Sequence, residues 1–406
     1  MELTDSKYPQ KSSQELLLRS STVLLCLWVA FLVGAMFYVG RSGGVQPADL
    51  LMIAIIGLTF SGVMVGVPAH IALYSTAGLF LGYVAAVNWI WYVIVPDFKF
   101  LEHSVYYAYN FAIFVVVVTL CRARSERFVL LTRWAIIAAL LLQLALIQLG
   151  FSSGRGRETG TFNNPNQLAY WALLLSASYL VLQGGRRLSI TDLCVLLLGG
   201  YITALSLSKA GMLGWVILLG SALFCQGIKN RLHVALLGLS ALAAVALIDP
   251  TLLSRLMQTE AIVNVDTRMQ TLGETEDDNL EGRGYDRIWL NPEYLILGAG
   301  EGEYSRFDSI LNLEMHSLFA NILFSYGIIG FILFMGFLYQ VFRKAPWPHW
   351  LYFSSIVFYG LAHQGLRFSF FWVFLALVFA LARYAPLSKA SSQCEARRET
   401  VQPQSW

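Results

Sequence analysis

The sequence predicts an all-α fold, a polytopic membrane protein with about twelve transmembrane helices and one large loop between helices nine and ten. Apolar residues make up 57% of the 406 residues and charged residues only 13%, whereas about a quarter of a soluble protein is charged. The mean hydropathy is +0.60. Apolar runs of about 17–25 residues, enough to cross the hydrocarbon as helices, recur along the chain. Its only long polar stretch lies between Asp249 and Met315.

These runs define the expected spans, whose ends carry an error of several residues. In chain order they are Ser20–Tyr38, Ala48–Val67, Ile71–Val95, Ser104–Cys121, Trp134–Gly150, Gln167–Val181, Leu193–Leu207, Gly211–Cys225, His233–Ile248, His316–Val341, Leu351–His363 and Ser369–Tyr384. The sixth, seventh, eighth and eleventh are short, so a pair of them could instead be re-entrant. The first is expected to be a membrane helix rather than a cleaved signal, because it lacks a suitable cleavage site and further spans follow it.

Lysine and arginine in short loops set the orientation of such a chain. With the N-terminus in the cytoplasm, seventeen of the 28 lysines and arginines lie inside, six lie in short outside loops and five in the long loop. This asymmetry predicts that both termini are cytoplasmic and that the long loop lies outside. The expected segments are a cytoplasmic tail (1–19), helices one to nine (20–248), the outside loop (249–315), helices ten to twelve (316–385) and a second cytoplasmic tail (386–406).

The charge content limits the expected classes of partner, and the cysteine content limits how the long loop can be held in place. The net charge of +3 is small and no basic run stands on a soluble face, so nucleic acid is not an expected partner. None of the five cysteines falls in an expected outside loop, so no disulfide framework is predicted there. Packing and hydrogen bonds must hold the loop instead.

Polar clusters gather on the expected outside face, and two of them precede the long loop. The first, Gly154–Gln167, includes Arg157. Its arginines, hydroxyls and amides suit phosphate or sugar oxygens, although a turn-rich connector has the same composition. The second is a hinge between two short spans that carries Lys209. A lysine there can reach a headgroup or a ligand phosphate, or it can simply extend its ammonium group to the interface.

The third cluster lies in the long loop and combines arginines, aromatic residues and glycines. It runs over Glu281–Trp289, with Arg283 and Arg287, and continues into the glycines of Gly298–Gly302. Arginine offers a planar fork to phosphate and an aromatic ring stacks on sugar. The alternative is turn glycines and structural ion pairs. The glycines are not a dinucleotide-binding motif, because no strand precedes them.

The fourth candidate is His316, which ends the long loop at the start of an apolar segment. A histidine at a helix start is often only an interfacial or capping residue. His316 is, however, the only histidine at the boundary of the long loop, and its neighbours form a small polar patch rather than a core. The sequence therefore favours His316 as a residue for chemistry.

These residues resemble a family. The segment His316–Gly330, a histidine followed by two glycines, resembles the histidine motif of the bacterial O-antigen ligase and O-antigen polymerase family. Thr159–Ala169 resembles the segment that opens the family's middle helix pair, and Arg283–Gly300 is similar to its large-loop signature. His363–Arg367 is similar to a polar patch near its last helices. The similarity covers roughly residues 154–367, in the family's order.

The resemblance implies a metal-independent, cofactor-free glycosyltransferase in the bacterial inner membrane, with its large loop and active site facing the periplasm. The implied donor is a glycan on undecaprenyl diphosphate, and the implied acceptor is a sugar, either on another repeat or on a lipid A core. Membrane lipids and other polysaccharide-assembly proteins are further implied partners. Whether the chain acts as a ligase or a polymerase stays open at this stage.

The same resemblance assigns roles to individual residues. His316 would act as the base or would orient the acceptor hydroxyl. The side chains expected to contact the diphosphate or the glycan are Arg283, Arg287, Lys209, Arg157 and Arg367. One departure matters: where ligases carry an arginine, three residues and a leucine, this chain reads Lys209–Leu213. Lysine keeps the charge but loses the bidentate fork, which leaves room for a polysaccharide polymerase.

A transporter or flippase is the alternative from another functional class. Coupled carriers place Asp or Glu in the middle of membrane spans, where such residues are costly and functional. The expected spans carry none at their centres, and the sequence has no evident inverted repeat. These two features favour an enzyme.

The predicted topology can be tested with single cysteines at Gly273 and in the tail after residue 386, in a background without native cysteines. An impermeant thiol reagent applied to intact cells should label the loop and spare the tail, because of the lysine and arginine asymmetry. The reverse labelling would contradict the orientation and, with it, a periplasmic active site.

Overall fold

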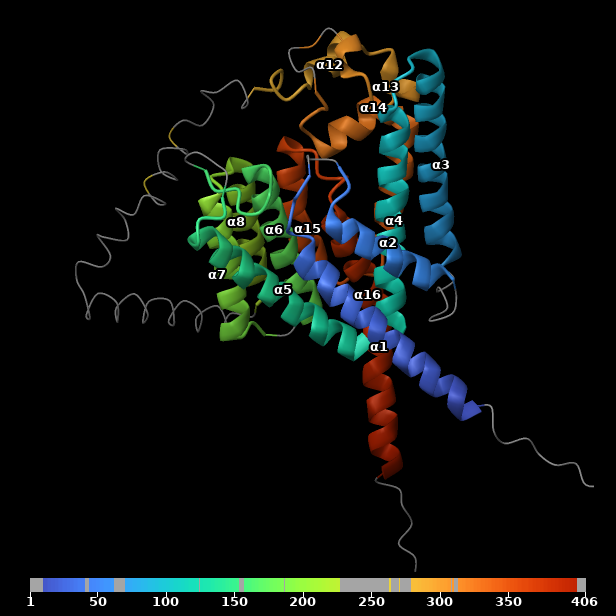
Figure 1. Ribbon diagram of the computed structural model, residues 1–406, viewed down its shortest axis with the longest axis vertical. Coiled ribbons are helices and arrows are strands. Elements are labelled where there is room, and N and C mark those ends of the chain that lie inside the picture. Colours follow the sequence, from blue (N-terminus) through green and yellow to red (C-terminus); the bar gives the residue numbers. More distant parts are fainter. Residues whose placement is uncertain are drawn as a thin grey trace, which may run out of the picture.

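The computed structural model (Figure 1) describes residues 10–40, 44–61, 70–123, 125–152, 157–185, 187–226, 263, 270, 279–307, 309 and 313–399. Within these residues all regular structure is helical. The helices are α1 (Gln10–Gly34), α2 (Pro47–Phe60), α3 (Ile71–Ile94), α4 (Lys99–Ala123), α5 (Ser125–Gln148), α6 (Pro165–Gln183), α7 (Ile190–Leu205), α8 (Lys209–Phe224), α12 (Asp286–Leu290), α13 (Tyr294–Leu297), α14 (Leu318–Phe342), α15 (Trp347–Ala362) and α16 (Ser369–Glu399).

Helices occupy eleven of the twelve segments expected from the sequence, and the ninth, His233–Ile248, lies outside the described residues. Four helices differ clearly from the expectation. α1 begins at Gln10 and α5 at Ser125, before the expected starts at Ser20 and Trp134. α2 ends at Phe60 after 14 residues, about 21 Å of helix at 1.5 Å per residue. α16 continues past the expected end at Tyr384, through Pro386, as far as Glu399.

Four of the described helices are long and apolar enough to cross a membrane, namely α3, α4, α14 and residues Glu126–Gln148 of α5. Shorter apolar helices are Thr22–Gly34, α2, α7, α8 and Ser369–Tyr384. In Figure 1, α3, α4 and α16 run almost along the long axis of the molecule, whereas α1, α2 and α5 are inclined to it. The start of α1 and the end of α16 lie at the lower end, opposite α12 and α13.

The centre of the molecule is formed by α6 and α16. Every residue of α6 from Leu168 to Gln183 is buried, and so is every residue of α16 from Phe370 to Leu381. α16 packs on α4 and α6. A helix that is apolar all round belongs in a protein core or a membrane, so these two helices form a scaffold around which the others are arranged.

The polar segment 298–302 is attached to a break in α14. Gly327 has φ 62° and ψ −175°, which interrupts the helix and removes the usual donors for the preceding carbonyl groups. The carbonyls of Phe324 and Ser325 accept hydrogen bonds from the N–H groups of Ala299 (3.0 Å) and Gly300 (2.8 Å) instead. The loop therefore takes the place of the missing helical turn.

Glycine is needed on both sides of this junction because the two backbones approach closely. A Cβ added to Gly327 would lie 2.2 Å from the carbonyl oxygen of Ile296. A Cβ added to Gly298, whose φ is +99°, would lie 2.5 Å from the carbonyl oxygen of Ser325. These are distances that no side chain can accept without a backbone shift, so the glycines noted in the sequence serve to fix the loop.

We predict that Gly298→Ala destabilises the protein by about 1–3 kcal/mol or more, because it combines a left-handed φ with a clash against backbone. Gly78→Ala is the matched control, since Gly78 lies in α3 with nothing within 4 Å of an added Cβ. Thermal unfolding of the two detergent-solubilised variants measures the difference. Equal unfolding temperatures would show that the junction does not hold the loop.

Candidate functional site

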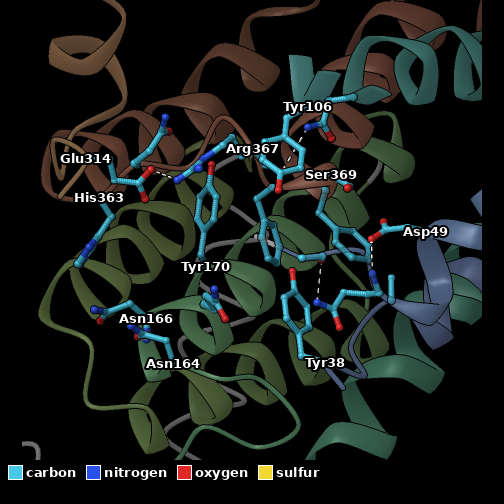
Figure 2. A pocket seen from close by; sticks show the side chains of 18 of the residues that line it. Tyr38, Asp49, Tyr106, Asn164, Asn166, Tyr170, Glu314, His363, Arg367 and Ser369 are labelled. Atoms are coloured by element: carbon cyan, nitrogen blue, oxygen red, sulfur yellow. Dashed lines mark hydrogen bonds and ion pairs between the residues drawn. The ribbon is translucent and has the colours of Figure 1, made fainter. Parts of the chain in front are cut away.

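A cavity of about 680 Å³ brings together polar residues from both halves of the chain. Five of the six side chains expected from the sequence line it. They are His316, Arg283, Lys209, Arg157 and Arg367. They come from the segment before α6, the start of α8, the long loop and the turn between α15 and α16. Figure 2 shows the cavity, with Arg367, Glu314 and His363 toward one end and Tyr38 and Asp49 toward the other.

Arg157 is positioned by the turn between α7 and α8. Its Nε donates to the carbonyl of Ser206 at 3.1 Å and its Nη2 donates to Oδ1 of Asn166 at 3.1 Å. Ser208 caps α8 by accepting from the N–H of Gly211, which makes Lys209 the first residue of that helix. The two cations therefore flank one helix junction, and both line the cavity.

Arg283 and His316 are joined through their backbones. The N–H of His316 donates to the carbonyl of Arg283 at 2.9 Å, and the guanidinium of Arg283 donates to the carbonyl of Ala362 at the end of α15. Ser317, the N-cap of α14, bonds to the hydroxyl of Tyr285 at 2.8 Å. The loop, the start of α14 and the end of α15 are thus held together where His316 meets the cavity.

An aromatic wall lies beside this histidine. The rings of His316 and His363 have centroids 6.2 Å apart, and the ring of Tyr359 lies 5.1 Å from that of His363. Tyr170 stacks on Tyr359 at 4.2 Å with an interplanar angle of 7°. All four residues line the cavity, so flat surfaces are available next to the cationic groups.

Arg367 is held by two neighbours, one acidic and one basic. It forms an ion pair with Glu314, and its Nη1 donates to Nε2 of His103 at 2.7 Å. The Nδ1 of His103 in turn bonds to the carbonyl of Glu301 at 2.5 Å. The position of Arg367 therefore depends on residues of α4 and of the long loop.

Glu301 is fully buried and its carboxylate is well supplied with donors. It accepts hydrogen bonds from Tyr326 (2.9 Å), Asn321 (3.0 Å), Tyr107 (3.2 Å) and Gln364 (3.4 Å). Burial alone would raise the pKa of the Glu301 carboxyl. The electrostatic effect of His103 and Arg367, together with these hydrogen bonds, instead holds that pKa below its usual value. The buried carboxylate thus remains charged and connects the loop to α4 and α14.

His103, Glu301 and Glu314 also form a donor set that could hold a divalent cation. Their ligating atoms all lie within 4.8 Å of one another. The guanidinium of Arg367 already bonds to two members of the set. Arg367 therefore supplies the positive charge to these groups, and the expectation of a metal-independent site remains a prediction.

The structure does not bring Arg287 to the cavity. Its side chain is 1% exposed, its Nη2 donates to the carbonyl of Leu313 at 2.6 Å, and its guanidinium lies over the rings of Tyr304 and Phe307. Arg287 is also missing from the residues that line the cavity. Its geometry favours packing within the loop, the structural alternative considered for this cluster.

The end of the cavity away from the cations is polar and aromatic. Asp49 of α2 accepts from the hydroxyl of Tyr109 at 2.7 Å and from the N–H of Gln46 at 2.8 Å, which fixes its carboxylate. Two further unpaired groups lie nearer to Arg367. The hydroxyl of Tyr170, whose ring stacks on Tyr359, and Oδ1 of Asn110, whose Nδ2 donates to the carbonyl of Arg367, are buried without a hydrogen-bond partner, and both residues line the cavity. Such groups suit a ligand with many hydroxyls.

Sequence reasoning missed several residues of this site. His103 and Asp49 lie near the ends of expected spans, and Glu301 sits among the loop glycines of the third cluster, where it was not singled out. Only Glu314 had a signal, because it precedes His316 by two residues. Nothing in the linear sequence shows that His103 and Glu301 meet, since 198 positions separate them.

No protein-family model matches this chain, and no curated protein sequence matches it.

We predict that Arg287→Ala lowers the unfolding temperature and the folded yield, because the substitution removes buried packing and a charge-assisted hydrogen bond of about 1.5–3 kcal/mol. Lys209→Ala, which changes a cavity-lining residue that is only partly buried, should leave the unfolding temperature nearly unchanged and reduce activity. Thermal unfolding and activity per folded molecule separate the two effects. Normal stability of Arg287→Ala combined with lost activity would return Arg287 to a substrate-binding role.

Proposed function

We propose that this protein is a membrane glycosyltransferase of the O-antigen ligase and polymerase type. It transfers a glycan from undecaprenyl diphosphate to a sugar hydroxyl at the periplasmic face of the bacterial inner membrane. The observation that carries the proposal is the convergence of His316, Arg283, Lys209, Arg157 and Arg367 on one cavity. Their separation in the sequence, from residue 157 to residue 367, makes a chance gathering of the predicted residues improbable.

The cationic end of the cavity suits the leaving group. In the proposed reaction the acceptor oxygen forms a bond to the anomeric carbon of the donor, and the bond from that carbon to the phosphate oxygen breaks. The electron pair goes to undecaprenyl diphosphate, whose growing charge is stabilised by Arg283, Lys209 and Arg157. Preorganised positive groups in a site with little water are effective at this task.

The acceptor proton needs a base at the same place. His316 is held by its backbone bond to Arg283, so the candidate base and a candidate phosphate contact keep a fixed spacing. A neutral imidazole can take a proton near pH 7. Glu314 is paired with Arg367, which lowers its value as a base and favours His316.

The opposite end of the cavity suits a sugar. Asp49 and its neighbouring tyrosines offer acceptors and flat rings. Toward Arg367, the unpaired groups of Tyr170 and Asn110 call for further ligand hydroxyls and amides. A charged diphosphate would be repelled by Asp49. This end therefore suits the acceptor, and the cationic end suits the donor.

The proposed topology has about twelve spans, cytoplasmic termini and the long loop in the periplasm. The four helices long enough to cross a membrane and the placement of α12 and α13 away from both chain ends (Figure 1) are consistent with it. The polyprenyl chain of the donor would lie along these helices, beside the cavity, where the surrounding lipid has the same chemistry.

A carrier for lipid-linked glycans is the second candidate, and the buried carboxylate of Glu301 is the observation that favours it. Such groups often bind coupling ions in transporters. Here four side chains and the nearby Arg367 already satisfy Glu301. A group so completely bonded has little freedom to bind and release a proton, which favours the enzyme.

The decisive experiment combines a deletion strain with the purified protein. His316→Ala and His316→Gln should both fail to restore polymer, because general acid–base catalysis contributes about two to four decades in rate. Glutamine keeps the hydrogen bonding but cannot take the proton. The purified wild type, mixed in detergent with extracted lipid-linked glycan and an acceptor, should form the new glycosidic bond and release undecaprenyl diphosphate.

The outcomes of this experiment distinguish an enzyme from a carrier and define the role of His316. A carrier moves the lipid-linked glycan across a membrane but forms no glycosidic bond. It would therefore give no product in the detergent mixture. An active His316→Gln would limit His316 to orienting the acceptor, and an active His316→Ala would remove it from the mechanism. In the deletion strain, loss of all long chains from lipopolysaccharide indicates a ligase. Caps of a single repeat indicate an O-antigen polymerase, and loss of a separate exopolysaccharide indicates its polymerase.

A further inference from the structure

A second, smaller cavity of about 190 Å³ lies at the other end of the helices that carry the site. It is formed by the start of α3, the end of α14 and the part of α16 around Phe379, and its polar lining residues are His70, Gln340, Arg343 and Arg383. α3 is 24 residues long, so about 36 Å of helix separate this cavity from the opposite end of α3.

Arg383 is fixed with part of its donor capacity unused. Its guanidinium carbon lies 3.6 Å from the centre of the Phe379 ring. It donates to the carbonyl of Gln340 at 2.9 Å and to the carbonyl of Phe379 at 3.1 Å. A guanidinium has five N–H groups, so donors remain on a rigid group that lines the cavity.

The surroundings of the cavity carry an excess of positive charge. Burial lowers the pKa of His70, and the next causes are the charges of Arg383, Arg122 and Lys344. Arg343 also lines the cavity. Across the residues that the structure describes, none of these four cations forms an ion pair with a carboxylate. Among the described residues, these positive charges therefore have no carboxylate to balance them.

One acceptor at the cavity lacks a donor. The Oε1 of Gln340, which lines the cavity, is buried without a hydrogen-bond partner. A buried polar atom left without a partner costs about 1–3 kcal/mol. A ligand that suits this cavity thus combines an anionic group with at least one hydrogen-bond donor.

The edge of the cavity is apolar. Ile71, which lines it, is 80% exposed, and Tyr339 at the end of α14 is 61% exposed. α3 and α14 are both long and apolar enough to cross a membrane. The ends of membrane-spanning helices lie at the level of the lipid headgroups. An anion attached to hydrocarbon chains fits this edge better than a free ion does.

We propose that this cavity binds the headgroup of an anionic phospholipid with hydroxyl donors, of the phosphatidylglycerol kind. The phosphodiester contacts Arg383 and Arg343, and a headgroup hydroxyl donates to Gln340. This site is independent of the proposed glycosyl transfer.

Titration of the purified full-length protein with phosphatidylglycerol or phosphatidylcholine, followed by native mass spectrometry, tests the proposal. Phosphatidylglycerol should bind the wild type more tightly. Arg343→Gln and Arg383→Gln should each weaken that binding about tenfold, the value of one charge-assisted contact. Arg343 is exposed, so Arg343→Gln gives a result even where Arg383→Gln does not fold. Lys99→Gln, at the other end of the bundle, is the matched control and should bind as the wild type does.

Three results would overturn the proposal. Equal binding of the two lipids by the wild type would exclude recognition of the headgroup. An equal loss in Lys99→Gln would reduce the effect to general surface charge. Millimolar inorganic phosphate that displaces the lipid, and that raises the unfolding temperature of the wild type but not of Arg343→Gln, would assign the cavity to a free anion.

Discussion

The architecture depends on the junction between the glycine segment of the long loop and the break in α14. Gly327 interrupts the helix, and the N–H groups of Ala299 and Gly300 satisfy the carbonyls that the break leaves without donors. Within a membrane protein an unsatisfied backbone group is expensive, so the break and the loop need each other. The same junction carries Glu301 into the space between α3, α4 and α14, where its donors are Tyr107, Tyr326 and Asn321. A polar loop is thereby made part of the helical core.

The positions of the candidate site residues depend on this junction. Glu301 bonds through its carbonyl to His103, His103 accepts from Arg367, and Arg367 pairs with Glu314. Glu314 lies two residues before His316, so the connected groups run from the core to the proposed base. Displacement of the loop would move both the cations and the histidine. This coupling explains how a loop without a disulfide can position chemistry, and it makes the loop a structural part of the cavity rather than a lid over it.

The sequence predicted what local patterns encode and missed what depends on distant contacts. Apolar runs located the helices, because a run of about 17–25 apolar residues is the length that crosses a membrane as a helix. Of the six residues that motif chemistry named, His316 and four of the five cations line the larger cavity. The same reasoning could not distinguish Arg287 from Arg283, since both lie in one sequence cluster. Only the fold shows that Arg287 packs against Tyr304 while Arg283 lines the cavity. Glu301 was missed for a related reason: a buried acid has no signature until its donors are known.

The two cavities place positive charge at both ends of one helical frame, and their surroundings imply different behaviour. At the larger cavity Arg367 is paired with Glu314, so in the proposed transfer a diphosphate that reaches Arg367 would compete with a carboxylate and could leave again. At the smaller cavity Arg383 and Arg343 have no carboxylate partner among the described residues, so the proposed lipid phosphate would meet no internal competitor. Between them α16 is buried from Phe370 to Leu381 and packs on α4 and α6. A helix enclosed on all sides resists sliding, which favours the lipid as a fixed anchor of the frame rather than as a signal to the catalytic end.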